Sequence, residues 1–339
     1  MSDWKQELNK WIAYPDLDIS LKKELETLLS DPEANAETLE ESFFKDLEFG
    51  TGGLRGVLGV GSNRLNLYTI RKATQGIADY IKHELKKEAA AVAIGYDSRI
   101  NSRLFAEEAA CVLVANGIRT YLYDTLYPVP GLVYALRHYR CEMGIMITAS
   151  HNPSKYNGYK VYNAAGHQAT DEESEKILSL MEQVDIFGGA RHIPFAEAQK
   201  SLLFSYIGDE TKALYVDRVM REAVCSADSQ ADIAAAMKAL RVVYTPLNGS
   251  GSKPVQEIMR RLAIGAVHMV KEQEEPDGTF PTCPYPNPES RDALALGIAL
   301  FEETGADILI GTDPDCDRMG IAVRATDGSC RLLTGNETG

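Results

Sequence analysis

The sequence predicts an α/β protein of two consecutive layered domains, preceded by a group of N-terminal helices. Amphipathic helical segments alternate with short apolar segments of strand length along most of the chain, a pattern typical of layered α/β domains. Several of the strand-length segments end in loops rich in Gly, Ser, Asn and Asp. The chain has 339 residues, of which 45% are hydrophobic, enough for two domains that each bury a core.

Residues 1–45 are expected to form packing helices. Two sets of apolar side chains recur at helical spacing, and Asp16 and Ser20 supply capping oxygens between them. The sets are Trp4, Leu8, Trp11 and Ile12, and then Leu21, Leu25, Leu28 and Leu29. Residues 48–66 follow, rich in glycine and carrying Arg55 and Arg64, without helical or strand periodicity. We predict a long ordered loop there.

The first α/β unit is predicted between residues 69 and 184, where helical and strand patterns alternate. Its expected helices are 69–87, 102–116, 131–139 and 171–184, and its expected strands are 91–97, 120–124, 144–148 and 159–163. Residues 187–203 are predicted to join this unit to the next one.

The second α/β unit is predicted to begin near Tyr206. Its expected helices are 209–224, 254–264 and 291–305, and its expected strands are 240–245, 306–311 and 321–325. A proline-rich loop, 275–290, lies between them. We therefore expect one domain over residues 1–200, a second over 201–326 and the start of a third over 327–339.

Composition and charge exclude several functions. The chain has 35 Lys and Arg against 49 Asp and Glu, a formal net charge of −14, and no basic block that could neutralise a phosphate backbone. Nucleic acid and anionic membranes are therefore not expected partners. No signal sequence or membrane-length apolar run is present, and six scattered cysteines without a CxxC pair indicate reduced thiols. We expect a cytoplasmic protein.

Three aspartates alternate with other residues directly after the predicted strand 306–311. In an extended loop, Asp313, Asp315 and Asp317 would point to one side. Three like charges repel one another, and hard oxygen ligands suit Mg²⁺. The sequence therefore predicts a magnesium site, with a solvated acidic turn as the alternative.

Two arginines separate this segment from a calcium-binding EF-hand loop. Arg318 stands at the sixth position, where an EF-hand needs Gly, and Arg324 at the twelfth, where it needs Glu. A positive side chain beside a cation site is reasonable when an anion also binds the metal. A phosphoryl group would be such an anion, because it could bind the metal and also pair with Arg318.

Ser150 ends an apolar strand-like run and is followed at once by the letters HNP. No G-x-S-x-G elbow surrounds it, so hydrolase chemistry is disfavoured. A phosphorylated serine gains a charge of about −1.5 to −2 and three acceptor oxygens, which match Mg²⁺, Arg318 and Lys160. An ordinary turn is the alternative for so short a motif.

Four motifs together resemble one family. They are FGTGGLRG at 49–56, GYDSR at 95–99, TASHNP at 148–153 with NGYK after it, and DPDCDR at 313–318. In this order they resemble the α-D-phosphohexomutases, specifically the phosphoglucomutase and phosphopentomutase branch. The resemblance implies two layered α/β domains of phosphohexomutase type.

The resemblance also implies an isomerase that moves a phosphoryl group within a sugar phosphate. Ser150 would carry and donate the phosphoryl group, through a bisphosphate intermediate, with glucose 1,6-bisphosphate as activator or phosphoryl donor. Conversion of glucose 1-phosphate to glucose 6-phosphate is the first expectation. Conversion of ribose or deoxyribose 1-phosphate to the 5-phosphate is the second.

Site residues follow from the same resemblance. Lys160 would transfer a proton or contact phosphate, and Arg55 and Arg318 would stabilise the anion. His151 would act mainly by its position, and Asn152 by fixing the loop. The implied catalytic residues are Ser150, His151, Lys160 and Arg55; the implied phosphate-binding residues are Arg318, Asn152 and Arg99; the implied Mg²⁺ ligands are Ser150, Asp313, Asp315 and Asp317.

The family has four domains, and this chain resembles the first two. We expect the 339-residue chain to bind Mg²⁺ but to turn over sugar phosphates weakly or not at all, because the third and fourth domains carry sugar-binding and phosphate-binding residues. Apolar surface at the position of the third domain is expected to favour self-association.

Two functions of other kinds stay open on sequence grounds. The letters ILIGTDPD resemble the strand and DxD of haloacid dehalogenase-type phosphatases, with Asp313 as nucleophile, but the residues 316–318 that follow depart from that pattern. A regulatory or sugar-phosphate-binding module without catalysis is the second alternative. The segment NGSGSKP at 248–254 lacks P-loop spacing and is predicted to be a strand-to-helix turn.

Overall fold

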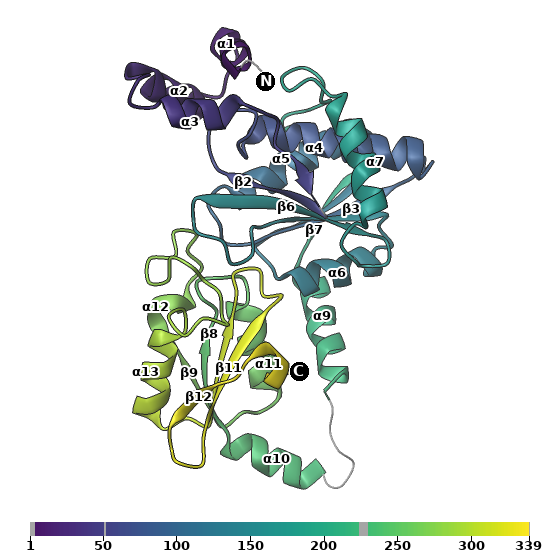
Figure 1. The fold of residues 1–339 in the computed structure, drawn as a ribbon. Coiled ribbons are helices and arrows are strands. Elements are labelled where there is room, and N and C mark those ends of the chain that lie inside the picture. The colour runs from purple at the N-terminus through teal and green to yellow at the C-terminus, as the bar shows by residue number, and fades with distance from the viewer. Residues whose placement is uncertain (1–3, 51, 224–229, 339) are drawn as a thin grey trace.

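The computed structural model describes residues 4–50, 52–223 and 230–338. Thr51 of the FGTGGLRG motif and Cys225 lie outside the described residues. The chain forms two α/β domains, each built on its own sheet, with three helices attached at the N-terminal end (Figure 1). The predicted fold class is confirmed.

The N-terminal helices are held to the first domain by an aromatic cluster around Trp11. These helices are α1 (Trp4–Ala13), α2 (Ile19–Ser30) and α3 (Ala36–Phe43). Trp11 is fully buried and packs edge-on against Phe43, Tyr68 and Phe187, with ring centroids 5.9, 5.6 and 5.1 Å away. As predicted, these are packing helices.

The sheet of the first domain has seven strands in the order β1-β2-β6-β5-β3-β4-β7. They are β1 (Phe49–Gly50), β2 (Gly53–Val57), β3 (Ala91–Tyr96), β4 (Arg119–Tyr123), β5 (Met143–Ile147), β6 (Tyr156–Asn163) and β7 (Phe204–Ile207). The central strands β5, β3, β4 and β7 are parallel, while β6 runs antiparallel to β5 and β2 antiparallel to β6.

The segment 48–66, which we predicted to be a loop, contains β1 and β2. Glycine at 53 allows this pairing, because a Cβ there would lie 2.0 Å from the Tyr159 carbonyl oxygen on β6. The glycines that weaken the strand pattern in the sequence are therefore the ones that let the backbones approach.

Helices cover both faces of the first sheet, as Figure 1 shows. They are α4 (Leu67–Asp79), continued by a π-helical turn (Tyr80–Glu84), α5 (Ser102–Ala115), α6 (Val129–His138), α7 (Asp171–Glu182) and the short α8 (Phe195–Ala198). α4, α5 and α7 pack together over one face, and α6 packs on the other. The helix α4 begins with a capping box between Asn66 and Thr69.

The second domain has a five-stranded sheet in the order β12-β11-β10-β8-β9. Its strands are β8 (Arg241–Thr245), β9 (Ala266–Met269), β10 (Ile308–Thr312), β11 (Met319–Arg324) and β12 (Cys330–Leu332), and its helices are α9 (Asp209–Arg221), α10 (Gln230–Ala239), α11 (Ser252–Arg261), α12 (Lys271–Glu274), α13 (Ala295–Thr304) and α14 (Gly335–Thr338). β8, β9 and β10 are parallel, whereas β10 and β11 form an antiparallel pair.

Strand pairing shows how far each sheet extends. β7 pairs with β4, so the first sheet continues past residue 200 to Ile207. β12 pairs with β11, so residues 330–332 add a strand to the second sheet. Both strands are short and lie at the edges of their sheets.

Two further expectations concern membrane-spanning helices and disulfide bonds. Of the helices in these residues, none has the length and apolar character that crossing a membrane requires. The five described cysteines, of which Cys111, Cys141 and Cys283 are buried, form no disulfide.

Candidate active site

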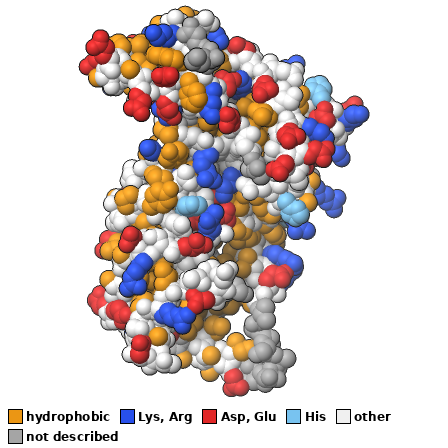
Figure 2. Space-filling model, in the orientation of Figure 1, with side chains coloured by type: hydrophobic (Ala, Val, Ile, Leu, Met, Phe, Trp, Pro, Cys, Tyr) orange, Lys and Arg blue, Asp and Glu red, His pale blue; other side chains and the backbone are white. Residues whose placement is uncertain are grey.

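Two loops, one from each domain, meet between the sheets. The first follows β5 and carries Ser150, and the second follows β10 and carries the three aspartates. On the face seen in Figure 2, basic, acidic and histidine side chains gather at the waist between the domains. Both loops lie at the carboxyl ends of parallel strands, where α/β sheets generally place their sites.

Ser150 sits in a strained and almost fully buried position. Its φ of 52° lies in the left-handed region, which is uncommon for a non-glycine residue. Its amide donates to the Thr148 hydroxyl at 2.8 Å, and its own hydroxyl donates to Asp313 Oδ2 in the other domain at 2.7 Å. Such an outlier persists only where its surroundings hold it, as at many functional sites.

Asp313, Asp315 and Asp317 come together as the two-residue spacing predicted. One carboxylate oxygen from each lies within 4.8 Å of the others. Asp313 and Asp315 are fully buried, and the amides of residues 317 and 318 donate to Asp313 Oδ1 at 3.2 and 3.0 Å. These two amides hold the Asp313 carboxylate toward Ser150.

Lys160 reaches the triad from the first domain. It lies on β6, and its Nζ is 2.8 Å from Asp315 Oδ2 and 3.0 Å from Asp317 Oδ2. Burial opposes its charge, but the two carboxylates overcome this effect and raise the pKa of Lys160. Burial likewise opposes the charge of Asp315, but Lys160 lowers the pKa of Asp315 overall. The ammonium group thus supplies one positive charge to three carboxylates.

The three carboxylates are not fully compensated by Lys160, and the remaining negative charge suits a divalent cation. Burial, and then the neighbouring Asp315, raise the pKa of Asp313. Asp315 Oδ1 is buried without a hydrogen-bond partner in the described part of the chain, and such an oxygen is costly unless a cation or donor meets it. Closely spaced carboxylate oxygens are the donor set that hard divalent cations prefer.

Three of the other predicted residues lie around Ser150 on the solvent side. His151 Nδ1 is 3.2 Å from the Ser150 hydroxyl, and burial and the charge of Arg318 lower the pKa of His151. Arg55 on β2 is exposed and donates to Asn152 Oδ1 at 3.3 Å. The Arg318 side chain is 47% exposed, with its Nε 4.0 Å from Asp317.

Arg99 lies beneath the serine loop and not among the solvent-facing arginines. Its side chain is fully buried, and its guanidinium donates to four main-chain carbonyls of the loop. These acceptors are Ser150 O at 2.6 Å, Asn152 O at 2.5 Å, Pro153 O at 3.1 Å and Tyr156 O at 2.9 Å. We predicted a phosphate contact for Arg99; in this structure its two terminal nitrogens donate to the loop backbone, and its Nε lies 3.4 Å from Asp97 Oδ2.

Two residues of the site were missed by sequence reasoning, although both fall in the quoted motifs. The Thr148 hydroxyl lies 2.6 Å from Asp97 Oδ2 and 3.2 Å from Asp315 Oδ2. Burial raises the pKa of Asp97, which also accepts from Ser102 at 2.8 Å. Both residues directly follow inner strands, β5 and β3, and that position was the available signal.

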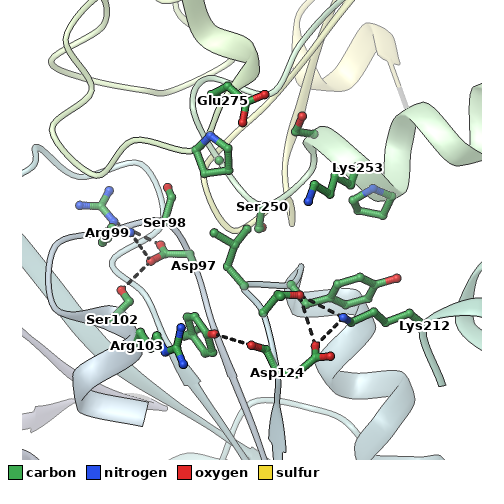
Figure 3. A pocket seen from close by; sticks show the side chains of 18 of the residues that line it. Asp97, Ser98, Arg99, Ser102, Arg103, Asp124, Lys212, Ser250, Lys253 and Glu275 are labelled. Carbon is green, nitrogen blue, oxygen red and sulfur yellow. Dashed lines mark hydrogen bonds and ion pairs between the residues drawn. The ribbon is translucent and has the colours of Figure 1, made fainter. Parts of the chain in front are cut away.

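A cavity of about 1280 Å³ separates the domains beside this site. Figure 3 shows Asp97 and Arg99 of the first domain on one side of it, and Ser250 and Glu275 of the second domain on the other. The cavity is thus lined by residues of both domains.

Comparison with known proteins agrees with this geometry. Residues 46–186 match the phosphoglucomutase/phosphomannomutase α/β/α domain I, and residues 213–328 match α/β/α domain II of the same family. A phosphoglucomutase from Staphylococcus saprophyticus is 36% identical over 320 residues, and one from Staphylococcus epidermidis is 34% identical over 333 residues. These alignments cover 94% and 98% of this chain.

A solved structure shares the fold. The phosphoglucomutase/phosphomannomutase family protein from Burkholderia thailandensis superposes with a TM-score of 0.63 at 21% identity, over 83% of this chain and 55% of that one. The chain spans 55% of the S. saprophyticus relative and 57% of the S. epidermidis one. With both domain models matched in order along its length, the chain belongs to the phosphoglucomutase/phosphomannomutase family.

Proposed function

We propose that this protein is a phosphoglucomutase, which interconverts glucose 1-phosphate and glucose 6-phosphate through a phosphoserine at Ser150. One observation carries the proposal: the hydroxyl of Ser150, in one domain, lies 2.7 Å from Asp313 Oδ2, which belongs to a triad of aspartates in the other domain. A phosphoryl group on that oxygen would need a nearby cation, and the triad is the group of side chains suited to hold one. The names of the aligned relatives favour glucose phosphates over pentose phosphates.

Asp313, Asp315 and Asp317 would hold Mg²⁺, with the phosphoserine as a further oxygen ligand. The ion would neutralise charge on the phosphoryl group during transfer. Lys160, already bonded to two of the aspartates, would balance the remaining negative charge. It would also stand ready to donate a hydrogen bond to a sugar or phosphoryl oxygen.

His151 would serve the oxygen of Ser150 itself. When phosphoserine gives up its phosphoryl group, the serine oxygen must regain a proton, and when it is rephosphorylated it must lose one. His151 Nδ1 is within reach of that oxygen at 3.2 Å, and its lowered pKa keeps the ring neutral at pH 7. A neutral imidazole can accept this proton and return it.

The arginines divide between two tasks. Arg55 and Arg318 present exposed guanidinium groups on the side from which an anionic substrate would approach, and they would stabilise phosphoryl oxygens. Arg99, committed to four loop carbonyls, would fix the nucleophile in place. We therefore assign Arg99 a positioning role.

The test is intact mass and phosphopeptide mapping before and after incubation with glucose 1,6-bisphosphate and Mg²⁺. We expect one phosphate on Ser150, absent in Ser150→Ala and present in Ser154→Ala, a matched change four residues away. Subsequent loss of that phosphate to glucose 1-phosphate, compared with ribose 1-phosphate, would report the preferred sugar. A wild-type chain that stays unphosphorylated would contradict the proposal.

The same experiment separates the phosphatase alternative. An acyl phosphate on Asp313 would be sensitive to hydroxylamine, whereas a phosphoserine is stable to acid and labile to alkali. The amides of residues 317 and 318 and the Ser150 hydroxyl already occupy both oxygens of Asp313. This arrangement suits a carboxylate that holds a cation better than one that attacks phosphorus.

A further inference from the structure

We propose that residues 277–280 of the second domain are a positioning element for the serine loop, and that they act through Arg99. The inference rests on the proposed function for its catalytic consequence, but its structural part can be tested separately. These residues lie in the proline-rich loop, for which the sequence analysis found no role. They approach the first domain at Arg99, and the two residues before them, Glu275 and Pro276, line the interdomain cavity.

Phe280 supplies the first contact. Its ring is 1% exposed, and the Arg99 guanidinium carbon lies 5.0 Å from the ring centroid. A guanidinium over an aromatic face in a desolvated setting is an attractive and direction-dependent contact. The ring therefore restrains the same guanidinium that holds four carbonyls of the serine loop.

The backbone of Phe280 is in a strained conformation, so the surrounding structure must hold the ring in this place. Its φ is 49°, in the left-handed region that bulky residues rarely adopt. The turn is closed by the Phe280 amide donating to Asp277 O at 3.2 Å and the Cys283 amide donating to Phe280 O at 3.1 Å. Phe280 thus combines a strained backbone with a ring that faces the buried Arg99 guanidinium, and strained residues of this kind cluster at functional sites.

Gly278 supplies the second contact. It forms an isolated parallel bridge with Arg99, and a Cβ at this position would lie 2.6 Å from both Ser98 O and Ile100 N. Any side chain would therefore push the segment away from the backbone that carries Arg99. Glycine is needed here for the close approach of two main chains.

The segment is tied to the aspartate loop by the turn at 248–250. The Asn248 carbonyl accepts from the Asp277 amide at 3.0 Å, and Asn248 Nδ2 donates to Glu275 O at 2.8 Å. Two residues on, the Ser250 amide and hydroxyl both donate to Pro314 O, each at 2.8 Å. One turn thus supports the aspartate loop and the segment that holds Arg99.

The consequence is a second connection between nucleophile and metal loop. The direct one includes the bond from Ser150 to Asp313 and the bond from Thr148 to Asp315. The indirect one runs from Pro314 through the 248–250 turn, residues 277–280 and Arg99 to the carbonyls of the serine loop. Phosphorylation of Ser150 replaces its hydroxyl hydrogen bond to Asp313, whereas the indirect connection does not involve that hydroxyl and so can help to keep the loop aligned through a catalytic cycle.

Hydrogen–deuterium exchange on the whole chain tests the structural part. Phe280→Leu keeps apolar volume but removes the aromatic face, and Phe280→Ala removes both. We expect exchange in peptides covering 149–157 to rise roughly tenfold in either variant, the scale of a lost desolvated cation–π contact. Tyr285→Ala, an exposed aromatic in the same loop, is the control and should leave that exchange unchanged.

Unchanged exchange at 149–157 in both Phe280 variants would overturn the proposal. The catalytic part is tested by the initial rate of Ser150 phosphorylation by glucose 1,6-bisphosphate, which should fall roughly tenfold in Phe280→Leu at unaltered half-saturating concentration. An equal rate in Phe280→Leu and wild type would refute that part. If the wild-type chain accepts no phosphate, the proposed function fails, and the exchange result still decides whether residues 277–280 position the loop.

Discussion

Removing the Lys160 charge should destabilise the metal-free chain strongly and make its stability depend on Mg²⁺. The Lys160 side chain is 13% exposed, and its partner Asp315 is fully buried. Loss of one partner from a buried ion pair costs about 3–5 kcal/mol, because the other charge stays buried. We expect Lys160→Met, which keeps most of the aliphatic stem, to lose about 3 kcal/mol of unfolding free energy in EDTA.

The assay is urea unfolding followed by circular dichroism, in EDTA and in excess Mg²⁺. Saturating Mg²⁺ should stabilise Lys160→Met more than wild type, because the cation takes over the charge that lysine supplied. Lys176→Met is the matched control: it breaks an exposed i,i+4 pair with Glu172 and should change stability by at most about 0.5 kcal/mol. A Lys160→Met chain that equals wild type in EDTA, or gains no more from Mg²⁺, would refute this reading of the triad.

Three other perturbations have defined outcomes. Because the pKa of Asp313 is raised in the folded state, the metal-free folded chain binds a proton that the unfolded chain releases, so stability should fall as pH rises above about 4. Asp313→Asn should flatten that dependence in urea titrations at several pH values; an unchanged slope would contradict it. Arg99→Lys should cost about 2 kcal/mol, since lysine cannot match the guanidinium fork, whereas exposed Arg103→Lys should cost little; equal losses would contradict this. Trp11→Ala should cost about 3–5 kcal/mol by the same assay, and a loss under about 1 kcal/mol would argue against the aromatic anchor.

A strand could be predicted where its own residues show the pattern of a buried strand. β3, β5 and β10 were predicted because each is a continuous or nearly continuous apolar run that ends at a polar loop. β2, β9 and β12 were not predicted, because their identity depends on a neighbouring strand. Gly53 of β2 serves its contact with β6, and β9 and β12 are only partly buried at sheet edges. The hydrophobic periodicity of one segment does not reveal a pairing strand that lies elsewhere in the chain.

The same distinction holds within the site. The triad could be predicted because its spacing is local, and the structure brings Asp313, Asp315 and Asp317 together. The task of Arg99 could not, because its carbonyl acceptors lie more than 50 residues away, on a loop that is adjacent only because β3 and β5 pair. Phe280 is harder still, since it approaches Arg99 from another domain.

Backbone strain at the site explains why contacts between residues far apart in the sequence are needed to hold it. Ser150, Cys316 and Phe280 all have positive φ, at 52, 54 and 49°, and each such residue costs of order 1–3 kcal/mol. The three lie in three different loops that converge at the domain interface. Within its own domain the serine loop is held by Arg99, whose guanidinium donates to the Ser150 and Asn152 carbonyls, and the ring that restrains Arg99 belongs to the other domain. Docking of the two domains therefore contributes to the orientation of the nucleophile, and a change that loosens the interface should disorder Ser150 before it unfolds either sheet.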